Sequence, residues 1–262
     1  MRPKRNISQL SMPNAPSPTA AVLLIGDEIL SGRTADVNLA TIAKFLVPYG
    51  IDVCEARVVR DVVEEIVEAL NALRARFTYV FTTGGIGPTH DDITADAVGR
   101  AFGVAVDYHP EALALLEPRY GPGEFNEMRK RMARIPAGAT LIRNSVSTAP
   151  GFQIGNVFVM AGVPMIMRAM LEDVGPRLER GVVVVTRTIS AQVGEGRIAA
   201  DLAQIQRDHT KVTIGSYPYS AEGAAGVQLV VRGRGGEAVE AAAKAIEAAL
   251  DREGIKSARI ST

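Results

Sequence analysis

Short apolar runs alternate along the first hundred residues with stretches in which apolar side chains recur every three or four positions. Residues 21–25 and 79–83 are runs typical of strands buried on both faces, and residues 51–59 form another strand-like segment. Helical spacing marks residues 36–48 and 63–73. Strands and helices that alternate in this way predict an α/β fold, with helices on both faces of a parallel sheet.

The second half of the chain continues this pattern and then restarts it. Two helices are expected within residues 109–134, short strands within 140–161, and a helix that begins at Pro164, where a missing N–H costs nothing. The elements expected after Gly181 are strands at 182–189, 212–217 and 227–231 and helices at 198–205 and 239–250. We therefore predict a disordered tail (1–19), a three-layer α/β/α domain (20–183) and a smaller α+β domain (184–262).

Charge and composition narrow the classes of partner. Lys and Arg together number 29, as do Asp and Glu, so no global field favours nucleic acid or an anionic membrane. Residues 1–19 contain no apolar stretch long enough for a signal peptide, and no run of the sequence approaches the ~20 apolar residues of a membrane span, so we expect a cytoplasmic protein. Cys54 is the only cysteine, which excludes an intrachain disulfide, and we expect it to be buried.

Two polar, glycine-containing loops follow the first and third predicted strands. They span Gly26 to Asp36 and Gly84 to Thr94. Because the carboxyl ends of parallel strands meet at one edge of the sheet, where ligands bind in such folds, these loops are the first candidates for a site.

The second loop has the composition of a phosphate cradle. Gly84, Gly85 and Gly87 allow positive φ angles and a close approach of backbone N–H groups to a ligand. Thr94 is suited to be the N-cap of the helix that follows. The spacing matches neither the P-loop nor the dinucleotide-binding glycine motif, so neither of those nucleotide sites is supported.

Acidic residues in both loops complicate a simple phosphate site. Asp91 and Asp92 would repel phosphate unless a cation such as Mg²⁺ lay between them, and Asp27 and Glu28 add acids in the first loop. The alternative is that these carboxylates only cap helices and turns. Two acidic loops at one sheet edge favour a functional site.

Four cations lie between residues 125 and 134. The ordinary interpretation is a solvated helix face, with Phe125, Met128 and Met132 on the other face. The alternative is that Arg129 or Lys130 contacts a ligand phosphate.

Taken together, these motifs resemble the amino-terminal region of the CinA (competence/damage-inducible protein) family over roughly residues 20–180. The matching positions are Gly26-Asp27-Glu28-Ile29-Leu30 with Gly32, Asp36 and Asn38, then Gly84 to Thr94, Asn126, Pro136, Gly138, Ala139, Asn144 and Ala149 to Phe152. The smaller α+β domain (184–262) is similar to the small domain that follows this region in the family. The wider group includes gephyrin-like and MogA/MoaB-like molybdenum cofactor proteins, whose glycine–aspartate loop resembles Gly84, Gly85, Gly87, Asp92 and Thr94, and Asp61 resembles their second acidic position.

The resemblance implies a three-layer α/β fold that binds a pterin such as molybdopterin, or a dinucleotide. In the CinA branch it also implies metal-dependent hydrolysis of ADP-ribose or FAD diphosphates. Asp92, Asp91 and Glu28 would then hold the metal or position water, with Asp61 as a further acid. Gly26, Asn38, Thr94 and the three loop glycines would contact the ligand.

This chain departs from the family pattern in three ways. Ala161-Gly162-Val163-Pro164 stands where the family often has Pro-Gly-Pro-Pro, and Lys130 replaces a common Gln. The sequence also ends at Thr262. We therefore expect no nicotinamide-nucleotide amidase domain and assign no amidase activity.

Three functions remain after sequence analysis. The first is a metal-dependent diphosphatase of ADP-ribose-like or FAD-like molecules. The others are a non-catalytic molybdopterin-binding module and a molybdopterin adenylyltransferase. Because the resembled families generally self-associate, a homo-oligomer is expected as well.

Overall fold

The computed structural model describes residues 17–221 and 224–260, and these divide into two compact units between Gly181 and Val182. Most of the predicted tail, residues 1–16, lies outside the described residues. Among the described helices, none combines the length and apolar character needed to cross a membrane.

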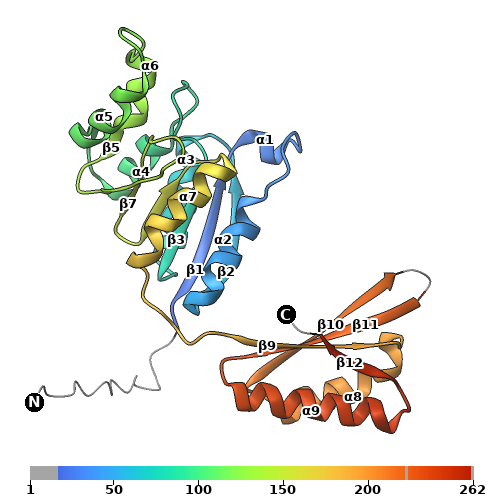
Figure 1. The fold of residues 1–262 in the computed structure, drawn as a ribbon. Coiled ribbons are helices and arrows are strands. Elements are labelled where there is room, and N and C mark those ends of the chain that lie inside the picture. The colour runs from blue at the N-terminus through green and yellow to red at the C-terminus, as the bar shows by residue number, and fades with distance from the viewer. Residues whose placement is uncertain (1–16, 222–223, 261–262) are drawn as a thin grey trace, which may run out of the picture. The chain divides into compact units, whose positions relative to one another are not determined.

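The first unit is built on a six-stranded sheet in the order β2-β1-β3-β8-β7-β6 (Figure 1). The first four strands in that order run parallel, whereas β7 and β6 are antiparallel to their neighbours. The strands are β1 (Thr19–Ile25), β2 (Asp52–Val59), β3 (Tyr79–Thr83), β6 (Thr140–Ile142), β7 (Gly151–Ile154) and β8 (Val157–Met160). A separate antiparallel pair joins β4 (Val106–Tyr108) to β5 (Arg134–Pro136).

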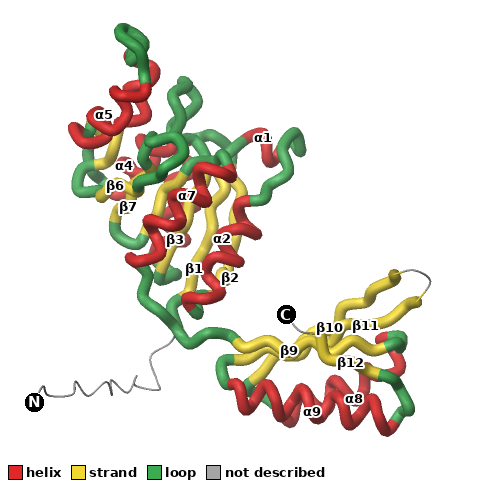
Figure 2. Tube along the Cα trace, viewed as in Figure 1, coloured by secondary structure: helices red, strands yellow, loops and turns green. Residues whose placement is uncertain are grey.

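Helices cover both faces of this sheet, as Figure 2 shows. The helices of this unit are α1 (Asp27–Leu30), α2 (Asn38–Leu46), α3 (Val63–Arg74), α4 (Thr94–Phe102), α5 (Pro110–Leu116), α6 (Glu127–Lys130) and α7 (Pro164–Val174). Of these, α2 and α7 pack on one face of the sheet and α3 and α4 on the other. Short 3₁₀ turns lie at Val47–Tyr49, Glu117–Arg119, Arg131–Ala133 and Gly175–Arg177.

Side chains of strand β1 contact helices on both faces of the sheet, which gives the unit its three layers. Alternate side chains point to opposite faces of a strand, so Val22 and Leu24 join a buried cluster with α2 and α7, whereas Leu23 and Ile25 join one with α3 and α4. A wholly apolar strand is stable here because helices bury both of its faces. The predicted three-layer α/β architecture is confirmed.

The second unit has one sheet with two helices on one face. The elements are β9 (Val185–Ala191), α8 (Glu195–Asp208), β10 (Val212–Ala221), β11 (Ala224–Gly233), α9 (Gly236–Arg252) and β12 (Ser257–Ile260). The strand order is β10-β11-β9-β12, entirely antiparallel. This split β-α-β arrangement confirms the predicted small α+β unit. The closing strand β12 and the pair β4–β5 were not predicted.

Cys54 corrects one expectation from the sequence. Its side chain is exposed, not buried. It lies on β2, the edge strand of the sheet, where Cys54, Ala56 and Val58 all face solvent. An apolar-looking edge strand can therefore leave one face uncovered.

Candidate functional site

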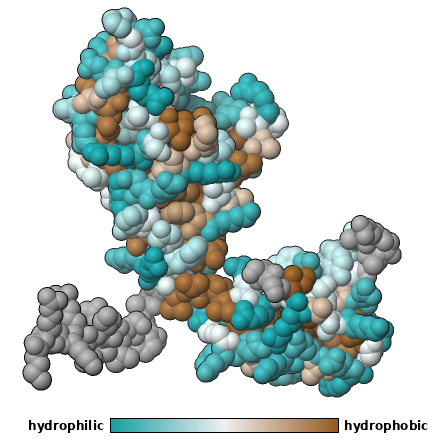
Figure 3. Space-filling view, in the orientation of Figure 1, coloured by the Kyte–Doolittle hydropathy of each residue, from teal (hydrophilic) through white to brown (hydrophobic). Residues whose placement is uncertain are grey.

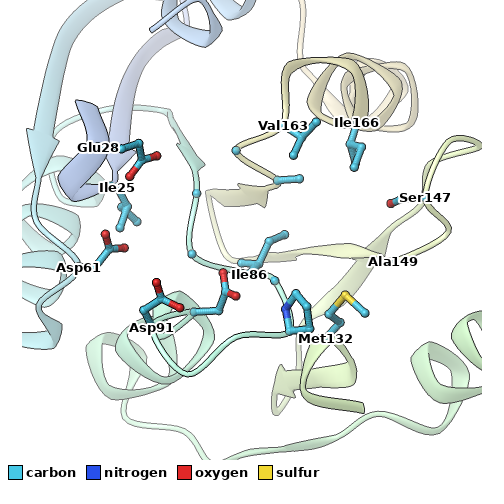
Figure 4. Close-up of a pocket in the computed structure, with 18 of the residues that line it drawn as sticks. Ile25, Glu28, Asp61, Ile86, Asp91, Met132, Ser147, Ala149, Val163 and Ile166 are labelled. Atoms are coloured by element: carbon cyan, nitrogen blue, oxygen red, sulfur yellow. The ribbon is translucent and has the colours of Figure 1, made fainter. Parts of the chain in front are cut away.

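A cavity of about 430 Å³ opens at the carboxyl ends of β1, β3 and β8 (Figure 4). The loops after all three strands line it, through Gly26, the segment Gly84–Pro88 and the segment Ala161–Val163. Both loops predicted from the sequence thus reach one cavity. The third, after β8, was not predicted to take part.

The glycine loop packs too tightly to accept side chains. Gly84 and Gly85 have φ angles of 106° and 67°. A Cβ on Gly84 would lie less than 3.0 Å from the backbone oxygen of Ile25, and one on Gly85 would come equally close to the hydroxyl of Thr94. The predicted positive φ angles are present at Gly84 and Gly85 but not at Gly87, and the approach of these N–H groups to a ligand stays a prediction.

Thr94 fixes the loop, but not as the predicted N-cap. Ile93 occupies the cap position of α4 and Thr94 is its first residue. The buried Thr94 hydroxyl donates to the backbone oxygen of Gly84 at 2.9 Å, and its N–H donates to that of Gly85 at 3.0 Å. The side chain turns back toward the strand end instead of capping its own helix.

The Asp92 side chain stabilises the part of this loop between Gly87 and Asp92. Its Oδ2 accepts hydrogen bonds from the backbone N–H of Thr89 at 2.8 Å and from the Thr89 hydroxyl at 2.6 Å. A Cβ on Gly87 would lie 2.6 Å from the same oxygen. Asp92 therefore has a structural role, alongside any role in binding.

Four carboxylates line the cavity, from Glu28, Asp61, Asp91 and Asp92, and Figure 4 shows the first three of these on one side of it. Asp61 enters from the loop after β2, and its Oδ2 accepts the backbone N–H of Asp27 at 3.0 Å. Burial raises the pKa of the Asp61 carboxyl, and the charges of Glu28, Asp27 and Asp91 raise it further, against the effect of that hydrogen bond.

These acids do not form a ready metal cluster. Within residues 17–221 and 224–260, no group of three His, Cys, Asp or Glu side chains could hold an ion alone. The predicted set of Glu28, Asp91 and Asp92 is therefore not preassembled. The side chain of Asp91 is 67% exposed, so it can still reach a ligand in the cavity.

The opposite side of the cavity is apolar. Figure 4 shows Met132, Ala149, Val163 and Ile166 facing the carboxylates, with Ser147 beside them. Apolar side chains also reach the surface at the start of α7, where Val163 is 53% exposed, and brown residues appear close to that end of the helix (Figure 3). None of these residues was predicted to be part of the site.

The basic residues considered from the sequence lie elsewhere. Lys130 pairs with Glu127 at 2.7 Å, and the Arg129 guanidinium lies 4.4 Å from the ring of Tyr120. Arg131 instead approaches the glycine loop from behind, and its Nη2 donates to the backbone oxygen of Asp92 at 3.3 Å. No Lys or Arg is among the described residues that line the cavity.

Of the predicted ligand contacts Gly26 and Asn38, only Gly26 lines the cavity. Gly26 lines it, and a Cβ there would lie 2.6 Å from the carboxylate oxygens of Glu28. Asn38 is buried at the start of α2, where its Nδ2 donates to the backbone oxygen of Gly162 at 2.7 Å. The carboxylate of Asp36 accepts the backbone N–H groups of Asn38 and Leu39 and so caps α2.

Comparison with known families gives two matches that together cover most of the chain. A family described as the probable molybdopterin binding domain matches residues 21–180, and the FAD synthase middle domain matches residues 183–259. Protein Ta0487 of Thermoplasma acidophilum is 32% identical over 246 residues, which is 90% of this chain and 94% of the relative.

Relatives with CinA names match the first unit. A CinA-like protein of Citrifermentans bemidjiense is 43% identical over 160 residues, 58% of this chain but only 38% of that protein. Among solved structures, one described as the protein CinA with unknown function from Thermoplasma acidophilum aligns with a TM-score of 0.58 and 34% identity, over 62% of this chain and 98% of the other. The resemblance seen in the motifs is confirmed.

Proposed function

Because this chain belongs to the family of probable molybdopterin binding domains and continues into a segment similar to the FAD synthase middle domain, we propose that its first unit binds a phosphate-bearing nucleotide or pterin. We further propose that it hydrolyses diphosphates of the ADP-ribose or FAD type. The observation that carries the proposal is the division of one cavity into an acidic side and an apolar side.

This division suits a ligand with two chemically different parts. A flat heteroaromatic ring would pack against Val163 and Ile166, where water leaves an apolar surface. The phosphates would lie near the N–H groups of the loop from Gly84 to Gly87.

A phosphate in this cavity requires a companion cation. Four carboxylates line the cavity with no basic residue among its described lining, so a bare diphosphate would be repelled. Carboxylate oxygens are ligands that suit Mg²⁺, which commonly takes one or two of them together with substrate phosphates and water. Asp91 and Glu28 fit that requirement, and the ion would supply stabilisation of charge on the phosphoryl oxygens.

Other residues of the cavity would have separate roles in the proposed hydrolysis. Asp92 holds the loop through Thr89, while the glycine N–H groups orient the diphosphate. Asp61 has a raised pKa and lies in the cavity, so it is placed to accept the proton of the attacking water. Water oxygen would form the new bond to phosphorus as the bridging P–O bond breaks.

A second candidate is a binding module without catalysis. The described residues contain no preassembled metal group, and the same loops would hold a molybdopterin phosphate. Fold alone does not choose between the two roles.

The deciding experiment incubates the purified protein with ADP-ribose or FAD, with MgCl₂ or with a chelator, and quantifies the mononucleotide products. We expect metal-dependent cleavage that falls strongly in Asp61→Asn and persists in Asp107→Asn, an exposed aspartate outside the cavity. Binding of molybdopterin or these nucleotides without turnover under any divalent metal would leave the binding module as the function.

We also propose that the protein is a homo-oligomer. Among the described residues, β10 and β12 of the second unit have no partner strand on their outer edges, although the Gln206 side chain bonds the backbone of Val212 and Ile214 in β10. Proteins tend to cover such edges. Light scattering at micromolar concentration tests this, and a monomer mass would contradict it.

A further inference from the structure

A second, smaller hollow of about 70 Å³ adjoins the main cavity. It lies between the segment from Thr34 to Asn38 and the turn that leads into α7. The two hollows share three lining residues, Ile25, Glu28 and Gly162. These three residues form the boundary between the two hollows.

Asn38 lines this second hollow with an unused acceptor. The residue is only 6% exposed, and its Oδ1 is buried without a hydrogen-bond partner among the described residues. The amide orientation is fixed, because Nδ2 donates to the backbone oxygen of Gly162 at 2.7 Å. Buried polar atoms are rarely left unsatisfied, and such an exception calls for a partner from outside the chain.

The other charged groups of the hollow narrow the chemistry of that partner. Glu28 is a carboxylate, and the carboxylate of Asp36 is already used by two backbone N–H groups. The charged groups that line the hollow are all acceptors, which favours a partner with an N–H or O–H donor. Val163 directly follows Gly162, so a ring packed against Val163 lies beside the boundary that the two hollows share.

We propose that Asn38 Oδ1 accepts a hydrogen bond from an exocyclic amino group on the ring of the ligand, so that this hollow selects amino-bearing rings. The proposal rests on the proposed function, because it takes a heteroaromatic ring as the bound group. Adenine and pterin share this chemistry, since each carries an amino group at its edge.

The test measures affinity by calorimetry, with MgCl₂ present, for two pairs of probes. ADP-ribose with a methylene group in place of its bridging diphosphate oxygen, which the proposed hydrolysis cannot cleave, is compared with its hypoxanthine counterpart, and pterin with lumazine, in which an oxo group replaces the 2-amino group. In at least one pair the amino-bearing probe should bind the unmodified protein about tenfold more tightly, the effect of one satisfied hydrogen bond. The pair that responds distinguishes a nucleotide from a pterin.

Two variants then assign the preference to Asn38. Asn38→Ala should abolish the preference for the amino-bearing probe. Asn156→Ala is the matched control, because Asn156 Nδ2 ties together backbone oxygens of Arg74 and Phe77 but lines neither hollow. That variant should lower the melting temperature and leave the preference intact.

Three results would overturn the inference. Equal binding of both members of each pair by the unmodified protein would do so while leaving the proposed function intact. An Asn38→Ala variant that weakens both members equally would reduce Asn38 to its structural tie with Gly162. Failure of all four probes to bind would overturn the inference and the proposed function together.

Discussion

The packing of Gly85 against Thr94 makes a quantitative prediction about stability. Gly85 has a φ of 67°, and a Cβ there would collide with the Thr94 hydroxyl. Gly103, at the other end of α4, has a φ of 68° but nothing within 4 Å of its Cβ position. Gly85→Ala and Gly103→Ala therefore share the same backbone strain and differ in the collision.

The magnitudes follow from these two terms. A left-handed alanine costs about 1–2 kcal/mol, so Gly103→Ala should destabilise the protein by that amount. Gly85→Ala must also displace the Thr94 hydroxyl, which donates to the buried backbone oxygen of Gly84, the residue that follows β3. Leaving that carbonyl unsatisfied adds about 1–3 kcal/mol. A difference of about 2 kcal/mol should separate the melting temperatures by about 4–8 °C.

Differential scanning calorimetry is the suitable assay, because it can resolve the transitions of two units. A double-mutant cycle completes the test: in a Thr94→Ala background the collision is absent, so Gly85→Ala should cost no more than Gly103→Ala. Equal destabilisation by both glycine substitutions in the parent protein would refute the packing argument. An unchanged cost in the Thr94→Ala background would do the same.

Three further outcomes are expected. Asp91→Asn should reduce metal-dependent diphosphate hydrolysis by about a hundredfold, equivalent to ~2.7 kcal/mol of barrier. Because the Asp91 side chain is exposed, the same change should alter stability by less than about 0.5 kcal/mol. Turnover and melting temperature measured on one preparation check both expectations, and parent-like turnover would remove Asp91 from the site. Arg259 lowers the pKa of Glu247, so the pair stabilises the second unit at pH values above the ordinary glutamate pKa of about 4.3, and this contribution disappears as pH falls through the lowered pKa. Urea titrations between pH 6 and pH 3 should therefore show that Arg259→Gln loses less stability on acidification than the parent protein does. The same dependence of stability on pH in both proteins would contradict the assignment. Cys54 should react with a thiol reagent in the native protein at a rate close to that in urea, and strong native protection would contradict its exposure.

Periodicity predicted the long elements because their energetics are dominated by burial. The apolar run of β1 indicates a strand that other elements cover on both faces, and the helical spacing of α3 indicates a helix covered on one face. Short elements show no such pattern, because β4 and β5 have three residues each and β12 carries Arg259 between small and apolar residues. Cys54 was misjudged because local sequence does not distinguish an edge strand from a central one.

The site was predicted only as far as the sequence revealed which strand ends meet. The loops after β1 and β3 stood out through their glycines and acids. The loop after β8 has a similar signature, an apolar run followed by Gly162 and a helix that begins at Pro164. Its parallel alignment beside β3 was not apparent from sequence, so Val163 and Ile166 were missed. Thr94 was assigned as a cap because a hydroxyl at a helix start can turn in either direction.

The boundary between Gly181 and Val182 has a consequence for how such chains evolve. The second unit has its own apolar core, drawn from residues 189–255, and all the described residues that line the cavity lie between Ile25 and Met170. A recombination event at this junction would disrupt neither core and remove no lining residue. Selection can therefore act on the binding chemistry and on the second unit as separately heritable modules, and natural fusions that exchange the carboxyl-terminal partner should keep the cavity intact.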